Sequence, residues 1–293
     1  MLLRSRVDLH VHSRHSEIGG DWSLRALSCR ESYATPLQVY DRARKAGMDF
    51  VTITDHDEIS GALEIAHLPN TFVSEEVTTF FPEDQCKIHV LVFGINESQH
   101  REMQKLRRSV YELVAYLNAE NLVHAIAHPF FRMSPFHSLE HVEKMLLLFN
   151  IIEGKNGGMQ THPDDLLLRL IAGLTPARMA QLARKHRLEP VGARPWQKSV
   201  IGGSNDHAGI RIGKPHTACP PVTTVAELLL VLRAGCSEVI GHSGPRTFMA
   251  PNIYNVGEYA ESLDRELMKR ARLDFLGASP RDDRERRAYF VDR

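Results

Sequence analysis

The chain has 293 residues, of which 43% are hydrophobic and 25% charged, and this composition excludes a largely disordered protein. Lys and Arg total 36 and Asp and Glu total 36, so no net charge draws the chain to nucleic acid or to an anionic membrane. The apolar run at residues 145–152 is far shorter than the roughly 20 residues that span a bilayer, and the N-terminus has no apolar signal segment. With four scattered cysteines, we expect a cytoplasmic protein without a membrane partner.

The predicted elements alternate between strand and helix along most of the chain. Short runs rich in β-forming residues predict strands at residues 7–12, 49–55, 71–78, 87–94, 122–127, 150–153 and 200–204. Helical patterns occupy residues 36–46, 97–119, 139–148, 176–186 and 225–233, with Thr35 and Gly47 as the expected cap and stop of the first helix. The alternation of predicted strands and helices ends near residue 241. We therefore expect a single α/β domain over residues 1–240 and a C-terminal appendage over residues 241–293.

Polar side chains recur on one face of strand after strand. The period of two places Asp8, His10 and His12 on one face of the first strand. Further candidate ligands follow at the C-terminal ends of later strands, namely His56, Glu76, His128, Asp206 and His207. In a barrel of alternating strands and helices, that rim is where active sites are built. The pattern therefore indicates a barrel with its site at one rim.

The pair of His10 and His12 is the strongest chemical signal. Two imidazoles on one strand face, preceded by an acid, are typical of a metal site, because neutral imidazole is the commonest nitrogen ligand. Two Asp-His pairs lie further along the chain, Asp55-His56 and Asp206-His207. Each is a weaker signal alone, but both follow apolar strands, and this shared position makes a metal-binding role for them more plausible. Of the adjacent carboxylates Glu75 and Glu76, the period of two favours Glu76, which shares a face with the polar residues of its strand.

Taken in order, these residues resemble the ligand motifs of the polymerase and histidinol phosphatase (PHP) family. The matching segments are 8–13, 54–57, 76–78, His89, 127–129 and 203–208. Members of that family are distorted barrels of seven strands and helices that usually hold two or three divalent ions, and the catalytic members mostly hydrolyse phosphate esters. The resemblance implies a distorted (β/α)7 barrel for this chain. Segments 128–156 and 202–217 look most like the PHP domains that precede a glycosyltransferase in some bacterial chains.

The resemblance also implies which residues hold the ions, position by position. The first ion would be bound by His10, His12, Glu76 and Asp206. The second would share Glu76 and add His89 and His128. The third would be bound by His56, His207 and Glu17, with His15 and Asp21 as alternatives to Glu17. The resemblance therefore implies two to three ions, and mixed histidine and carboxylate ligands favour zinc, manganese or iron.

The leading functional hypothesis is metal-dependent hydrolysis of a small phosphorylated metabolite or nucleotide by a hydroxide held by the metal ions. Arg132, four residues after His128, is the cation expected to face the substrate. Two alternatives are hydrolysis of a C–N bond, as in amidohydrolases, and a non-catalytic PHP module for binding or assembly. Long nucleic acid is not an expected partner, because no continuous basic and aromatic stripe is present. The oligomeric state is left open.

Overall fold

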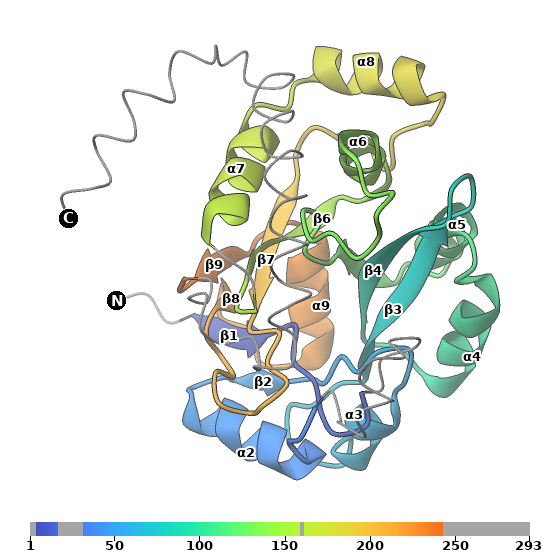
Figure 1. The fold of residues 1–293 in the computed structure, drawn as a ribbon. Coiled ribbons are helices and arrows are strands. Elements are labelled where there is room, and N and C mark those ends of the chain that lie inside the picture. The colour runs from blue at the N-terminus through green and yellow to red at the C-terminus, as the bar shows by residue number, and fades with distance from the viewer. Residues whose placement is uncertain (1–3, 17–31, 159–160, 243–293) are drawn as a thin grey trace.

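The computed structural model describes residues 4–16, 32–158 and 161–242 (Figure 1). Nine strands lie in this part of the chain: β1 (Ser5–Asp8), β2 (Phe50–Val51), β3 (Ser74–Phe81), β4 (Cys86–Phe93), β5 (Val123–Ile126), β6 (Ile151–Asn156), β7 (Ser199–Gly203), β8 (His216–Cys219) and β9 (Glu238–Ile240). Eight helices lie there too: α2 (Pro36–Lys45), α3 (Ser60–Glu64), α4 (Glu97–Leu106), α5 (Val110–Ala119), α6 (Leu139–Leu148), α7 (Thr161–Ala172), α8 (Pro176–His186) and α9 (Val225–Arg233).

The strands form two sheets, and the predicted distorted (β/α)7 barrel is wrong. One sheet has the order β2-β1-β8-β9 and the other the order β3-β4-β5-β6-β7. In the described residues, β1 with β2, β5 with β6 and β6 with β7 pair in parallel. The remaining four ladders are antiparallel. The part of the chain that the structure describes is therefore a pair of mixed sheets covered by helices, without closure into a barrel of parallel strands.

The link between β3 and β4 shows why the barrel prediction failed. Only residues 82–85 separate the two strands, whereas a parallel neighbour needs a crossover of a dozen or more residues. The strands therefore form an antiparallel hairpin, with Ser74 opposite Phe93 and Phe81 opposite Cys86. Gln85 completes the turn in the left-handed region, at φ 59°. The sequence carried this signal, because no helix was predicted between residues 78 and 87.

The seven predicted strands are all present, with shifted ends, and most predicted helices are confirmed. The α2 helix begins after Thr35, whose side chain accepts the Gln38 N–H, and the helix ends before Gly47 at φ 84°. The predicted helix at 97–119 is two helices, because Ser109 caps the start of α5. The short α3, the α7 helix, the inner strand β8 and the edge strand β9 were not predicted.

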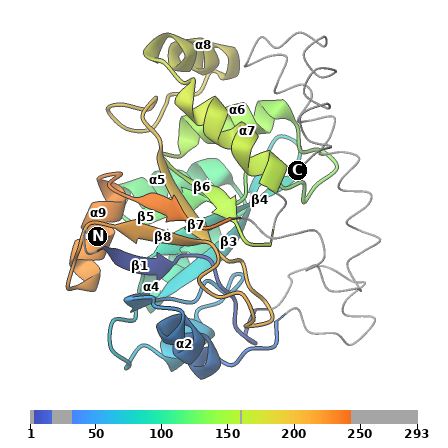
Figure 2. The ribbon, with the colours of Figure 1, turned by 90° about the vertical axis from the view of Figure 1, so that its left-hand side faces the viewer.

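Helices cover the sheets on several sides. The α2 and α3 helices lie on one side of the molecule, and α6, α7 and α8 lie on the opposite side (Figures 1 and 2). One apolar cluster fills the space between the five-stranded sheet and helices α4 to α8, and it includes Val90, Leu113 and Leu147. A second cluster contains side chains of both sheets, such as Val7 and Leu91, and packs against α9. The two sheets thus share part of one hydrophobic core.

The two sheets meet where the strands end. Isolated bridges join Val11 to Asp206 and His56 to Glu76. At the first of these junctions, a Cβ on Gly203 would lie 2.3 Å from the Cβ of His10, so only glycine lets β7 pass this close to the segment after β1. These junctions bring the polar residues that follow several strands into one place.

Among the described residues, no helix is long and apolar enough to cross a membrane. The predicted appendage at 241–293 lies outside the described residues, apart from Gly241 and His242.

Candidate metal centre

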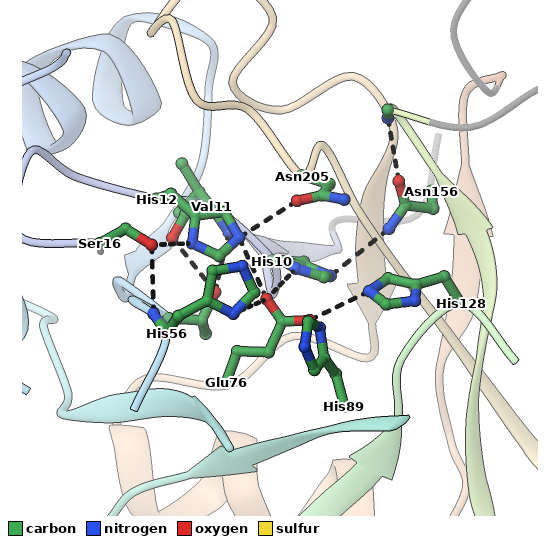
Figure 3. A network of polar contacts seen from close by, with 12 residues as sticks. His10, Val11, His12, Ser16, His56, Glu76, His89, His128, Asn156 and Asn205 are labelled. Atoms are coloured by element: carbon green, nitrogen blue, oxygen red, sulfur yellow. Dashed lines mark hydrogen bonds and ion pairs between the residues drawn. The ribbon is translucent and has the colours of Figure 1, made fainter. Parts of the chain in front are cut away.

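Glu76 lies at the centre of a buried ring of histidines (Figure 3). Its side chain is fully buried in β3, and an isolated bridge holds His56, in the segment after β2, beside it. The surrounding rings come from the segments after β1, β2 and β5 and from the middle of β4: His10, His12, His56, His89 and His128. The structure thus brings together six of the predicted ligands. Glu75, the neighbouring carboxylate, points to the other face of β3 and contacts His100.

The two carboxylate oxygens of Glu76 face different histidines. Three ring nitrogens lie near Oε2: Nε2 of His10 at 2.9 Å, Nε2 of His12 at 3.2 Å and Nδ1 of His56 at 3.3 Å. Two lie near Oε1: Nδ1 of His89 at 2.8 Å and Nε2 of His128 at 3.0 Å. One carboxylate therefore stands between two sets of nitrogen donors, which is the arrangement that a bridging ligand requires.

The position of His89 explains why the strand-end argument could not find it. The β4 strand runs antiparallel to β3, and His89 lies in its middle, directly opposite Thr78. Its ring nevertheless reaches Glu76, because Glu76 lies on the same hairpin two residues before Thr78. Only the family resemblance pointed to this residue.

The charges in the cluster are strongly coupled. Burial is the largest influence on the pKa of Glu76 and would raise it, but His10, His56 and His89 together hold that pKa well below its ordinary value. Burial likewise favours a neutral His10, yet the carboxylates of Glu76 and Glu153 outweigh it and hold the pKa of His10 well above its ordinary value. The central carboxylate is therefore ionised.

The pKa values of His12 and His89 are shifted in the opposite direction to that of His10. Burial lowers the pKa of His12 to about 3 and the pKa of His89 to about 3. Both imidazoles are therefore neutral near pH 7, and each carries a nitrogen lone pair. Neutral imidazole is the form that binds a metal ion.

Two aspartates that precede the histidines clamp the backbone. The Asp8 carboxylate accepts N–H groups of His10, Ser204 and Gly213, at 3.2, 2.9 and 2.7 Å. The Asp55 carboxylate accepts the N–H and the hydroxyl of Ser13, each at 2.6 Å. Burial raises the pKa of each aspartate to about 6. These residues fix the loops that carry the histidines.

Glu153 is a site residue that the sequence analysis missed. It is 1% exposed, and its Oε1 lies 2.9 Å from Nδ1 of His10. Its Oε2 accepts the backbone N–H of His128 at 2.8 Å and the side-chain amide of Asn156 at 2.9 Å. Glu153 thus orients two of the histidines around Glu76. The signal was available, because Glu153 is the last residue of the predicted strand 150–153, where the other candidate ligands were sought.

The segment after β7 differs from the prediction in which side chain it presents. The carboxylate of Asp206 accepts backbone N–H groups of its own loop, from Ala208 and Gly209 at 2.7 Å each and from Arg211. Asn205 was not predicted, but its Oδ1 lies 3.1 Å from Nε2 of His12 and 3.1 Å from Nε2 of His207. The period of two could not have found it, because Asn205 lies beyond the end of β7 with a φ of 47° and is not extended.

The remaining predicted site residues lie in three different situations. His207 stacks on His12, with ring centroids 4.1 Å apart and ring planes at 8°. The guanidinium of Arg132 donates to backbone carbonyls of its own loop, at Ser134 and Pro135. Glu17 lies outside the described residues, as does the alternative ligand Asp21. The other alternative is His15, whose Nε2 lies 2.9 Å from Oε2 of the exposed Glu64.

The donor atoms fit divalent transition ions. Three groups of residues each bring their ligand atoms within 4.8 Å of one another. The groups are His10, His12 and Glu76; His56, Glu76 and His89; and His10, His128 and Glu153. All of these atoms are imidazole nitrogens or carboxylate oxygens, the mixture that zinc, manganese and iron accept. Such a buried polar cluster is costly unless its groups are paired or coordinate a metal. The residues present are therefore able to hold more than one ion.

The chain resembles known proteins over part of its sequence and over most of its structure. No protein-family model matches the chain. Over 72 residues the chain is 36% identical to an uncharacterized protein of Methanocaldococcus jannaschii, and this match covers 25% of the chain and 40% of the length of that protein. A solved structure of an amidohydrolase from Chromobacterium violaceum has a TM-score of 0.46 at 17% identity, covering 80% of this chain and 97% of that one.

The solved structure of a two-domain protein from Bacteroides vulgatus is more similar, with a TM-score of 0.51 at 13% identity. The similarity covers 82% of this chain and 65% of that protein, which is described as containing a predicted PHP-like metal-dependent phosphoesterase. The chain therefore shares its fold with that protein.

Proposed function

We propose that the chain is a metal-dependent phosphoesterase that hydrolyses a small phosphorylated metabolite or nucleotide. The observation that carries the proposal is the division of the histidines between the two oxygens of Glu76. His10, His12 and His56 lie on the Oε2 side, and His89 and His128 lie on the Oε1 side. A carboxylate placed in this way can bridge two divalent ions. Paired ions would lower the pKa of a water molecule and neutralise the oxygens of a phosphoryl group during in-line attack.

The chain's own residues hold this geometry before any substrate arrives. Glu153 orients His10 from the far side of the ring and fixes the backbone of His128. Such outer partners set which ring nitrogen faces the ion and make that nitrogen more basic. The clamps of Asp8 and Asp55 limit movement of the loops after β1 and β2. The site would therefore lose little free energy to reorganisation when ions bind.

The size of the substrate follows from charge. The chain has a formal net charge of zero, and a long nucleic acid would need several phosphate contacts for binding. We retain Arg132 as the candidate cation for a second anionic group on the substrate, because it lies in the loop that follows His128. To act in this way, its guanidinium would exchange the carbonyls of Ser134 and Pro135 for the substrate.

The test combines metal analysis with a substrate panel. The protein is expressed with added manganese, zinc or iron, and its metal content is measured by mass spectrometry. Each form is then assayed with phosphomonoesters, cyclic phosphates, oligonucleotides and amide substrates. We expect two or more ions per chain and hydrolysis of small phosphomonoesters.

Two results would overturn the proposal in different ways. Loaded protein that cleaves only amides would contradict the phosphoesterase assignment and support C–N hydrolysis. Protein that binds no ion under any of these conditions would contradict the metal centre itself. A variant with Glu76→Gln, assayed in parallel, shows whether any activity belongs to this site.

A further inference from the structure

The junction between strand β3 and the segment after β2 brings His56 and Glu76 together. The N–H of Glu76 donates to the carbonyl of Asp55 at 3.1 Å, and the N–H of Asp57 donates to the carbonyl of Glu76 at 3.0 Å. His56 lies between these two backbone bonds, with its Nδ1 3.3 Å from Oε2 of Glu76 (Figure 3). The position of the His56 ring therefore depends on how firmly the residue that follows it is held.

Asp57 is held in a conformation that its backbone does not favour. Its φ of 54° lies in the left-handed region, which is uncommon for a residue other than glycine. Two hydrogen bonds to its carboxylate offset this cost: Oδ1 accepts the backbone N–H of Thr78 at 2.7 Å, and Oδ2 accepts a proton of Nη1 of Arg107 at 2.7 Å. The same Nη1 lies 3.4 Å from the carbonyl oxygen of Thr78. Asp57 and Arg107 together thus tie the segment of His56 to the edge of β3.

Arg107 reaches Asp57 from the end of helix α4. It is the residue that follows the last turn of α4, and its side chain is 32% exposed. Seven residues earlier, and thus two turns away on the same side of the helix, His100 contacts Glu75. One side of α4 therefore contacts a sequence neighbour of His56 and a sequence neighbour of Glu76.

We propose that Arg107 is a positioning residue of the metal centre, and that it acts through Asp57 to hold His56 beside Glu76. The inference rests on the proposed function. The guanidinium bonds to Asp57 and Thr78, neither of which belongs to the three groups of ligand atoms. Without it, one side-chain bond instead of two holds the left-handed residue next to His56. The ion beside His56 should then bind more weakly, because binding must fix a ligand that was free to move.

Arg107→Gln tests the proposal at a partly exposed position, where the substitution opens no cavity in the core. We expect the affinity for one manganese ion to fall about tenfold, at the low end of the effect that outer partners have on metal binding. The readout is a titration of manganese against a competing chelator. Arg107→Lys keeps the charge but not the forked donor, so it should recover part of the lost affinity.

Arg101→Gln is the matched control on the same helix. Arg101 forms an ion pair with Glu97 at 3.6 Å, and the two side chains are 66% and 64% exposed. Such exposed pairs contribute little, so the ion affinities should equal those of the wild-type protein. An equal loss of affinity in Arg101→Gln would show that the charge of α4, and not the contact with Asp57, causes the effect, and would overturn the inference.

Two double-mutant cycles show whether Arg107 acts through His56. In a His56→Gln background, Arg107→Gln should change none of the remaining ion affinities, because the side chain that it positions is already gone. In a His128→Gln background the tenfold loss should persist, because His128 contacts the other oxygen of Glu76. Equal losses in both backgrounds would contradict the inference. Should His56→Gln not fold, Asp57→Asn replaces it, since asparagine tolerates the same φ and removes the charge that Arg107 contacts.

Two further results separate the inference from the proposed function. An Arg107→Gln protein that melts at a lower temperature but binds ions as tightly as the wild-type protein would show that Arg107 has only a structural role, while the metal centre stands. A wild-type protein that binds no ion would overturn the proposed function, and the inference with it.

Discussion

The two faces of β3 place neighbouring glutamates in contrasting surroundings. Glu75 and Glu76 are both fully buried, and both contact histidine. Glu75 meets a single ring, that of His100, and burial raises the pKa of Glu75. Glu76 meets five rings, and three of them, His10, His56 and His89, hold its pKa well below its ordinary value. Burial of a carboxylate beside a histidine is therefore not enough to make a metal site. What distinguishes Glu76 is that the ends of several strands converge on its face.

The largest expected effect is that of Glu76→Gln. The substitution removes the charge that both sets of histidines share, so at least one ion should be lost, and hydrolysis should fall by on the order of 1,000-fold. Metal content and the initial rate on a phosphomonoester measure the two effects. A Glu76→Gln protein that keeps its ions and its rate would show that the two faces of β3 do not differ as we conclude.

Glu153→Gln should give the next largest effect. Glutamine has one acceptor oxygen where the carboxylate has two, so an amide oxygen that faces the N–H of His128 leaves Nδ1–H of His10 without its acceptor, and loss of such an outer partner typically weakens metal binding about 10- to 100-fold. The amide can still accept the N–H of His128, so the fold should be retained. Chelator competition measures the affinity, and the melting temperature checks the fold. Complete loss of an ion would instead identify Glu153 as a ligand, in the group it forms with His10 and His128.

Glu75→Gln is the matched test on the other face of β3. The side chain still accepts a hydrogen bond from His100 but loses its charge, so we expect the free energy of unfolding to fall by about 1 to 2 kcal/mol. Metal content and rate should match those of the wild-type protein. Urea denaturation measures the first quantity. A loss of ions comparable to that of Glu76→Gln would mean that both substitutions report folding and not chemistry.

The smallest expected effect is a pH dependence of the free energy of unfolding, and it comes from the pair of Glu75 and His100. The hydrogen bond to Glu75 raises the pKa of His100, and burial raises that of Glu75, so the folded protein holds protons that the unfolded chain releases. Stability should therefore fall as pH rises from the ordinary glutamate value of 4.5 through the raised pKa of His100. A double variant, Glu75→Gln with His100→Gln, should lose less stability over this range. Equal pH profiles of the unfolding free energy would contradict the assigned shifts.

The histidines around Glu76 could be located largely from local pattern. The period of two separated Glu76 from Glu75, and strand ends pointed to His10, His12, His56 and His128. His89 needed the family resemblance, because its strand is antiparallel and the strand-end argument does not apply to it. Glu153 lay within reach of the strand-end argument but was passed over, since it stands beside no histidine in the sequence. Asn205 was missed because an acid and a histidine follow it directly.

The sequence by itself determined seven of the nine strands of the described residues, most of their helices and the collection of imidazoles and carboxylates, because these depend on local periodicity, capping and residue type. Only the tertiary structure decided how the strands pair. The short link between β3 and β4 forces an antiparallel hairpin, and the late strands β8 and β9 extend the sheet of β1. The tertiary structure also decided that the amide oxygen of Asn205, and not the carboxylate of Asp206, faces the histidines. That choice depends on which backbone N–H groups compete for the Asp206 carboxylate, and these groups are placed by the folded loop and not by the pattern of residues.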